Sequence, residues 1–311
     1  MEIELTIIIS ALPIDSKGGG GWVSSRLNRR EKFNQFKIRN DFFLFKAAWA
    51  ILGILRYPFL HPIFCRYTPW IPRFINRETV VWLNFSQTFA LALGSRPCVL
   101  VCHDLQCHVP HRFKTWLRWS EGFLLRRGER VVVLSLRDAK VVRRYYKVAA
   151  DRIENLGPFL TGGLVPFKVE VPGPVQSVAF LGSLDRRENY EGLMWFVQHV
   201  LPACPTLQVM IIGQQSPRYS IDHPQLRYLG YVENLKEIIR MQDLMIAPMF
   251  SQAGIKIKVI ESLLERTPVL GTRASFSGLP KPEGSWITDR PTEWIARLNQ
   301  GGTYSYSEIV K

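Results

Sequence analysis

The residues best suited to chemistry lie in one short stretch, where two lysines and a glutamate follow a glycine. Lys256 and Lys258 are spaced for the first turn of a helix that Gly254 opens. The free backbone amides of a helix N-terminus and two ammonium groups form a natural cradle for a diphosphate. Glu261 follows at one-turn spacing, and an ionised carboxylate accepts two hydrogen bonds from a vicinal diol.

The same residues have an ordinary explanation. The lysines could form a solvated basic face, and Glu261 could be an exposed helix glutamate. Lysines in the first turn of a helix oppose its macrodipole, which costs roughly a few tenths of a kcal/mol unless an anion is bound. Stability alone does not favour this placement, and both interpretations stay open.

The elements around this stretch alternate between short apolar runs and helical patterns, which is typical of parallel sheets covered on both faces. In the first half, strands are expected at 5–10, 80–84, 98–103 and 131–135. In the second half, strands are expected at 178–181, 207–212, 225–229, 244–247 and 268–271, with helices at 189–200, 234–241 and 255–265. The pattern predicts two doubly wound α/β domains.

Proline and glycine divide these two series of elements. They are dense between 157 and 174, which predicts a linker. We therefore expect an N-terminal domain over 1–158, a linker over 159–174, a C-terminal domain over 175–295 and a tail over 296–311. Ligands of open α/β sheets bind beyond the carboxyl ends of the strands, so the expected site is a cleft between the two domains.

Charge is spread unevenly along the chain of 311 residues, whose formal net charge is +14. Residues 1–156 hold 25 Lys and Arg against 12 Asp and Glu, and the remainder holds 15 against 14. An anionic partner of the first half is expected, without a choice among nucleic acid, lipid head groups and a phosphorylated acceptor. Nucleic acid is not expected, because no recognition helix, zinc module or aromatic RNA-binding signature is found.

Five cysteines in a long chain, an odd number, do not suggest a disulfide framework, so a reducing, cytoplasmic compartment is expected. Three of them lie near His103 and His108, but the stretch reads as a buried strand without a second ligand cluster, so no metal site is expected. The N-terminus looks like a first strand and lacks the features of a signal peptide.

The segment 41–74 is rich in aromatic residues, leucine, arginine and proline. Its charges and prolines leave no uninterrupted run of about 20 apolar residues that could span a bilayer. The composition fits an interfacial segment at the inner face of a membrane, and equally a buried helix followed by an irregular loop.

The stretch 251–272 resembles the donor-binding signature of the family 4 retaining glycosyltransferases, which have the GT-B fold of two Rossmann-like domains facing a cleft. The matching positions are Gly254, Lys256, Lys258, Glu261, Pro268 and Val269. The resemblance implies that the lysines contact the diphosphate of a nucleotide sugar and that Glu261 holds the ribose hydroxyls. The family's earlier glutamate is replaced here by Ala253.

Residues 178–197 are similar to the family's first C-domain strand, glycine turn and helix. Ser183 and Glu188 occupy two positions where the family often has basic residues, so Arg186 or Arg187 would supply the charge. A later turn also matches the family, and the resemblance implies that its residues Tyr231 and Val232 face the base.

The N-terminal half carries a weaker resemblance. Gly19 and Gly20 lie in a glycine run similar to the loop that approaches the donor, although a flexible surface loop explains the run equally. His103 and Asp104 end a strand similar to the family's His-Asp-Leu strand, whose histidine reaches the transferred sugar. His103 could also be a buried strand-end histidine, and Asp104 a turn residue or, in an inverting enzyme, a general base.

The resemblance implies a hexosyltransferase-like enzyme that moves a sugar from a nucleotide-diphosphate sugar to a carbohydrate or lipid-linked acceptor, such as a polysaccharide precursor. It also implies retention of configuration, no obligatory metal and no cofactor. A nucleotide-sugar epimerase of the same fold and a basic non-catalytic partner protein stay open as alternatives.

Overall fold

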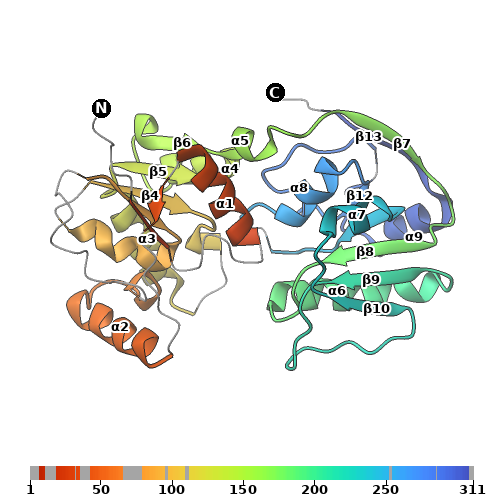
Figure 1. The fold of residues 1–311 in the computed structure, drawn as a ribbon, viewed down its shortest axis with the longest axis horizontal. Coiled ribbons are helices and arrows are strands. Elements are labelled where there is room, and N and C mark those ends of the chain that lie inside the picture. Colours follow the sequence, from red (N-terminus) through yellow and green to blue (C-terminus); the bar gives the residue numbers. More distant parts are fainter. Residues whose placement is uncertain are drawn as a thin grey trace. The chain divides into compact units, whose positions relative to one another are not determined.

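The computed structural model describes residues 7–10, 19–31, 33–35, 43–65, 79–94, 97–108, 112–251, 254–284 and 286–307. The chain divides into two compact units, the first comprising residues 1–160 with 253–255 and the second residues 161–252 with 256–311. Most of their elements are labelled in Figure 1. In the part of the chain that the structure describes, no helix is long and apolar enough to cross a membrane.

The first unit is built on a parallel six-stranded sheet with the order β2-β1-β3-β4-β5-β6. Its strands are β1 (Ile7–Ser10), β2 (Asn34–Gln35), β3 (Val81–Asn84), β4 (Cys98–Cys102), β5 (Arg130–Val133) and β6 (Ile153–Asn155). Its helices are α1 (Gly19–Glu31), α2 (Phe43–Arg56), α3 (Lys114–Leu125), α4 (Leu136–Arg144) and α5 (Gly157–Thr161), with 3-10 turns at Pro62–Cys65, Ser86–Leu93, Gln106–His108 and Ala150–Arg152.

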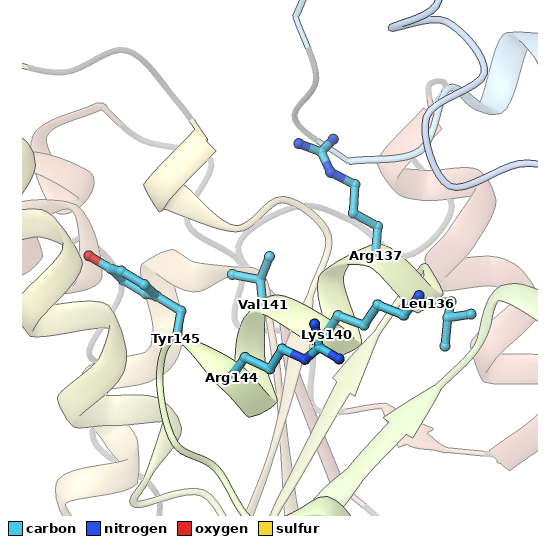
Figure 2. A pocket seen from close by; sticks show the side chains of 6 residues that line it. All are labelled: Leu136, Arg137, Lys140, Val141, Arg144 and Tyr145. Atoms are coloured by element: carbon cyan, nitrogen blue, oxygen red, sulfur yellow. The ribbon is translucent and has the colours of Figure 1, made fainter.

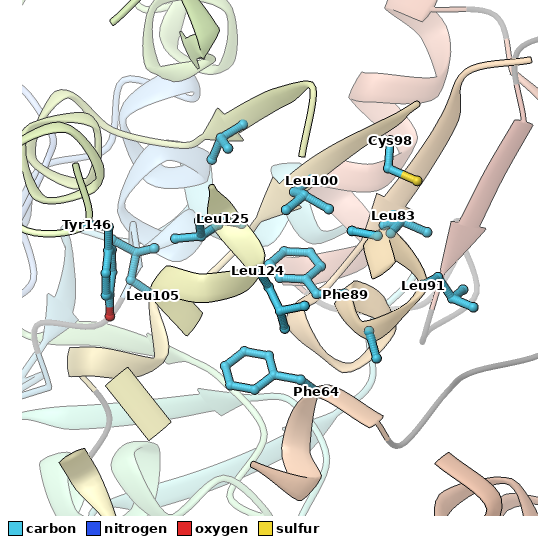
Figure 3. Close-up of a cluster of buried hydrophobic side chains, with 14 of the residues drawn as sticks. Phe64, Leu83, Phe89, Leu91, Cys98, Leu100, Leu105, Leu124, Leu125 and Tyr146 are labelled. Carbon is cyan, nitrogen blue, oxygen red and sulfur yellow. The ribbon is translucent and has the colours of Figure 1, made fainter. Parts of the chain in front are cut away.

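Both faces of this sheet are buried, as expected for parallel strands. On one face, alternate residues of β3, β4 and β5 join a core with side chains from the flanking turns and from α3, among them Phe64, Phe89 and Leu124 (Figure 3). On the other face, Trp82 of β3 is buried together with Val23 of α1. Burying each large apolar side chain contributes about 1.5–3 kcal/mol, which fixes the register of the strands.

The second unit contains a parallel five-stranded sheet with the order β10-β9-β8-β11-β12. Its strands are β8 (Ser177–Leu181), β9 (Gln208–Ile212), β10 (Leu226–Gly230), β11 (Leu244–Ala247) and β12 (Val269–Gly271). Its helices are α6 (Arg187–His199), α7 (Leu235–Arg240), α8 (Ile257–Leu264) and α9 (Pro291–Gln300), with a 3-10 turn at Leu201–Ala203. The doubly wound α/β fold expected from the sequence is confirmed.

A separate two-stranded antiparallel sheet was not anticipated. It pairs β7 (Phe167–Val171) with β13 (Gly302–Tyr306). The first strand lies in the segment expected to be a linker, and the second in the expected tail. Phe167 stacks on Tyr304 with ring centroids 5.6 Å apart, and Tyr304 is fully buried.

Each larger sheet reverses its strand order at one point. In the first sheet the reversal lies between β1 and β3, and in the second between β8 and β11. Ligands of open α/β sheets bind at the carboxyl ends of the strands beside such a switch point. Two half-sites follow from this topology, one in each unit.

Candidate functional site

The half-site of the first unit is organised by Asn84, the fully buried last residue of β3. Its Nδ2 donates to the Oγ of Ser10, 2.9 Å away, and to the Oγ of Ser24, 3.0 Å away. Its Oδ1 lies 2.7 Å from the Nε2 of His103. Because both amide hydrogens are used on the hydroxyls, Oδ1 accepts and Nε2 of the imidazole carries the proton.

His103 follows β4 directly, and the neutral side chains of Phe85 and Asn84 hold its ring. Its ring stacks on Phe85 with centroids 3.9 Å apart and an interplanar angle of 14°. Burial lowers the pKa of His103 from 6.5 to about 3, because a buried imidazolium loses its hydration. The histidine is therefore neutral at physiological pH, with Nδ1 as a hydrogen-bond acceptor.

Phe85 reaches this position with a backbone φ of +72°, which is uncommon for a bulky residue. Strain of this kind costs on the order of 1–3 kcal/mol and tends to occur at functional sites. In this backbone conformation the ring of Phe85 stacks on the imidazole of His103.

The turn that follows His103 and Asp104 is fixed by a residue that the sequence analysis missed. Glu121, buried on α3, accepts hydrogen bonds from the backbone N–H of Gln106 at 2.6 Å and of Cys107 at 3.0 Å. The hydroxyl of Tyr146 donates to the same carboxylate. No sequence signal singles out one glutamate within a helix, so only the fold reveals this anchor.

Burial raises the pKa of Glu121 to about 7, although its hydrogen bonds favour the charged form. Desolvation is thus the larger effect on this carboxyl group. Within the loop itself, the side-chain amide of Gln106 donates to the backbone oxygen of Asp104 at 3.3 Å. Asp104, predicted as a catalytic residue, is half-buried beside this anchored turn.

The predicted glycine loop is in part a helix, which corrects the sequence analysis. Gly19 and Gly20 form the first turn of α1, while residues 17 and 18 lie outside the described residues. Glycine in a helix interior costs about 1 kcal/mol relative to alanine, but the packing of the buried Val23 and Leu27 stabilises the helix. This helix also carries Ser24 to its hydrogen bond with Asn84.

The half-site of the second unit is centred on Lys258 of α8. Its Nζ donates to the Oδ1 of Asn189 at 2.8 Å and lies 4.5 Å from the centre of the Phe180 ring. The Nδ2 of Asn189 in turn donates to the backbone oxygen of Ser183 at 2.8 Å. The ammonium is thus held at the carboxyl end of β8 by an amide and an aromatic face.

Two glycines allow this ammonium to approach the strands. A Cβ at Gly182 would come within 2.9 Å of the Nζ of Lys258, and a Cβ at Gly213 would come within 2.6 Å of the carbonyl carbon of Gly182. Gly213 also has a φ of +141°. Any side chain at these positions would displace the backbone or the lysine.

The pKa of Lys258 is lowered from 10.5 to about 7. Burial is the largest cause, and repulsion from Arg186 and then Lys256 adds to it, opposed by Glu188. These three cations therefore share one electrostatic field, in which a bound anion would relieve both repulsion and desolvation.

The structure corrects the position of the other lysine. α8 begins at Ile257, so Lys256 is the residue that precedes the helix rather than part of its first turn. Gly254 lies before it with a φ of +58°, a conformation that favours glycine. Glu261 lies one turn after Lys258 on the same helix and is half-buried.

The two candidate arginines differ in their surroundings. Arg186 pairs with Glu188, its Nε 2.8 Å from the Oε1, and still acts on Lys258. Arg187 is 77% exposed and pairs with Glu191 one turn along α6 at 2.7 Å. The structure therefore associates Arg186, and not Arg187, with the lysine.

The predicted base-binding residues follow β10. Tyr231 is 59% exposed and Val232 is half-buried. The turn begins at Gly230, whose φ is +66°. Gly230, Gly213 and Gly182 all lie at the carboxyl ends of their strands, which are the neighbours β10, β9 and β8.

The five cysteines are all buried and free. Burial raises the pKa of the Cys102 thiol, and the nearby Glu121 and Asp138 raise it further. Among the residues that the structure describes, no group of three or more His, Cys, Asp and Glu could hold a metal ion.

In the segment 41–74, α2 exposes a row of large apolar side chains. Ile51, Leu52 and Leu55 are 58%, 54% and 70% exposed. Phe59 follows at 47% and contacts Trp119 of α3 edge to face at 6.5 Å. Residues 41, 42 and 66–74 lie outside the described residues.

Residues 175–300 match the family model of the glycosyl transferases group 1. Most of the second unit is therefore similar to that family. No curated protein matches the chain.

Solved structures of similar fold are glycosyltransferases with two Rossmann-like domains. Alr3699/HepE from Anabaena, in complex with UDP and glucose, is 11% identical with a TM-score of 0.56, and the match covers 95% of this chain and 88% of that one. WaaG, a glycosyltransferase involved in lipopolysaccharide biosynthesis, is 10% identical with a TM-score of 0.52, covering 87% and 81%. Sucrose-phosphate synthase from Thermosynechococcus elongatus is 11% identical with a TM-score of 0.53, covering 86% and 81%. The GT-B fold is confirmed.

Proposed function

We propose that this chain, whose residues 175–300 match the group 1 glycosyl transferases, moves a sugar from a nucleotide-diphosphate sugar to an acceptor. The observation that carries the proposal is Lys258, a desolvated ammonium repelled by two other cations at the switch point of its sheet. Such a group is energetically unfavourable until a polyanion binds. The carboxyl ends of the strands beside a switch point are where nucleotides bind to open α/β sheets, so a nucleotide diphosphate suits this position.

In this proposal Lys258, Lys256 and Arg186 neutralise the charge that builds up on the leaving diphosphate as the glycosidic carbon becomes cationic. Glu261 accepts hydrogen bonds from the ribose hydroxyls, and Tyr231 with Val232 lies along the base. These contacts need no metal ion, because the cations of the chain supply the positive charge.

The first unit would handle the transferred sugar and the acceptor. The neutral His103 accepts a hydrogen bond from a sugar hydroxyl through Nδ1. Glu121 fixes the turn that follows the adjacent Asp104. Transfer proceeds with retention in this proposal. If the products showed inversion instead, Asp104 would be the candidate general base.

The acceptor that we propose is a lipid-linked or polysaccharide precursor, presented at a membrane surface that the enzyme meets through α2. The support for this is the exposure of Ile51, Leu52 and Leu55 on one helix that carries Arg56 at its end. Apolar side chains with a flanking arginine fit the interface of an anionic membrane. Co-sedimentation with phosphatidylglycerol vesicles should be lost in the double variant L52E/L55E and kept in the wild type.

The activity can be tested by incubating the purified protein with radiolabelled nucleotide sugars and lipid extracts. Label should move from the nucleotide to a lipid or carbohydrate product, and the variant K258M should lose this transfer. The variant K236M is the matched control, because Lys236 is an exposed lysine of the same unit that pairs with Glu265 at 3.7 Å. Conversion of the donor sugar without an acceptor would instead indicate an epimerase.

A further inference from the structure

A second basic surface lies on α4, away from the residues discussed above. Leu136, Arg137, Lys140, Val141, Arg144 and Tyr145 line an open hollow with a volume of about 420 Å³ (Figure 2). A volume of this size is within the range of small-molecule sites, which is about 300–1,000 Å³. The lining combines three cations with apolar and aromatic side chains.

The spacing of these cations puts them on one face of the helix. Arg137, Lys140 and Arg144 stand at positions i, i+3 and i+7, with Val141 between them. Like charges at such spacings repel, and Arg137 in the first turn opposes the helix macrodipole. Arg144, in the last turn, is favoured by the macrodipole, so the placement that stability does not explain is that of Arg137 and Lys140.

The acidic residue of α4 lies at the start of the helix. Asp138 is buried, and it accepts a hydrogen bond from the hydroxyl of Ser135 at 2.8 Å, which caps the helix. Among the described residues, neither Lys140 nor Arg144 forms an ion pair, and both are exposed. Two cations of the row are thus available to a ligand.

Further cations of the first unit surround this face. Arg118 of α3 lies over the ring of Tyr145, 5.7 Å from its centre. Burial lowers the pKa of His108, and Arg137, Arg118 and Lys114 lower it further, so their fields overlap there. α4 follows β5, the neighbour of β4, and the carboxyl end of β4 carries His103. Arg137, in the first turn of α4, is therefore at the end of the sheet that carries His103, and the row runs from there along the helix.

We infer that this face of α4 is a binding site for a phosphate-bearing amphiphile, in which Lys140 and Arg144 take the phosphate and Leu136, Val141 and Tyr145 contact an adjoining apolar chain. Guanidinium and ammonium groups bind phosphate oxygens with charge-assisted hydrogen bonds. The site deepens the proposed function, on which it rests, by assigning the acceptor its chemical class, a lipid phosphate or diphosphate.

The test uses farnesyl diphosphate as a soluble probe, with binding to the full chain measured by titration calorimetry in a saturating excess of UDP, which occupies the donor site. The variant K140E/R144E should weaken binding at least tenfold. The matched control R143E/K147E makes the same change of charge with two exposed residues that do not line the hollow, and it should weaken binding less than threefold. Equal losses in both variants, or no binding to the wild type, would overturn the inference.

A second arm separates a soluble lipid phosphate from the head groups of a bilayer. Pyrophosphate should bind more weakly than farnesyl diphosphate, because it lacks the apolar chain. If K140E/R144E lost binding to phosphatidylglycerol vesicles while its affinity for farnesyl diphosphate stayed unchanged, the site would bind membrane head groups and the inferred acceptor class would be wrong. Since every readout is binding without sugar transfer, failure of the proposed enzymatic activity would be seen separately.

Discussion

The Nζ of Lys258 lies 2.8 Å from the Oδ1 of Asn189, so a lysine with a depressed pKa is held by a neutral amide at the switch point of its sheet. An amide orients the ammonium without neutralising it. The lysine can therefore still attract an anion, and its desolvation destabilises the protein when no anion is bound.

Replacing Lys258 with methionine should separate binding from stability. Charge-assisted hydrogen bonds contribute about 1.5–3 kcal/mol, so K258M should weaken UDP binding roughly 10- to 100-fold. Its melting temperature should not fall at neutral pH, because a charge that is disfavoured in the folded state has been removed. Titration calorimetry and thermal unfolding measure the two effects, and a large loss of both would contradict this assignment.

The affinity for UDP should depend on pH through the same lysine. The pKa of Lys258 is about 7 in the free protein, so the charged form that binds the diphosphate is lost as the pH rises above 7. We expect the dissociation constant to rise up to tenfold per unit between pH 7 and 9. The variant K258R should flatten this profile, because arginine stays charged throughout. A wild-type profile as flat as that of K258R would contradict the role of the lysine.

The pH dependence of stability has the opposite sign to that of binding. A lysine whose pKa is lowered in the folded state costs stability while the unfolded chain still binds its proton more tightly. The contribution of Lys258 to unfolding free energy should therefore rise between pH 7 and 10.5. Denaturant unfolding of the wild type and K258M should therefore show the difference between their unfolding free energies changing steadily as the pH rises from 7 to 10.5, as the penalty for Lys258 disappears.

The two arginines at the start of α6 should behave differently. R186A removes a cation that acts on Lys258, so it should weaken UDP binding about 3- to 10-fold and raise the pKa of the lysine. R187A removes an exposed pair with Glu191, which water screens, so its affinity for UDP should stay within twofold of the wild type. Equal effects would show that the field of Arg186 is unimportant.

Glu121 should act as a positioning residue for the turn after His103. In E121Q one backbone N–H of the turn faces an amide NH₂ group, which should cost about 1–3 kcal/mol of stability at pH 8. Because the folded pKa of Glu121 is raised to about 7, its contribution is greatest below pH 4.5 and declines as the pH rises through 7. The variant L117A, a core truncation on the same helix, is the control.

A positioning role predicts more than a loss of stability. The rate of sugar transfer in E121Q should fall while its affinity for UDP, which is bound by the other unit, stays unchanged. L117A should lose stability without this selective loss of rate. The pH profile of the rate should also shift in E121Q alone.

Much of the architecture could be predicted because the central strands of the two larger sheets are mostly buried and therefore apolar. β4 and β11 are buried at every position, so their sequences give an unbroken signal. β7 was missed because only Val171 of its five residues is buried, and alternating polar residues in a segment rich in proline predicted a linker. Its pairing with β13 is a contact between residues more than 130 positions apart, which local patterns do not reveal.

The residues predicted for the second half-site were chosen because their order along the chain resembles a family signature. Asn189 was missed, since an asparagine near the start of a helix is ordinary and its hydrogen bond to Lys258 spans 69 positions. The helical start of α1 was also missed, because a glycine run predicts a loop whereas the burial of Val23 and Leu27 favours a helix.

The stacking of Phe85 on His103 restricts what the first half-site can recognise. One face of the imidazole is covered, and Nε2 is occupied by Asn84, so a ligand meets a single lone pair at one edge of the ring. Such an edge selects a hydroxyl that donates, and discriminates against deoxy and O-methylated sugars at that carbon.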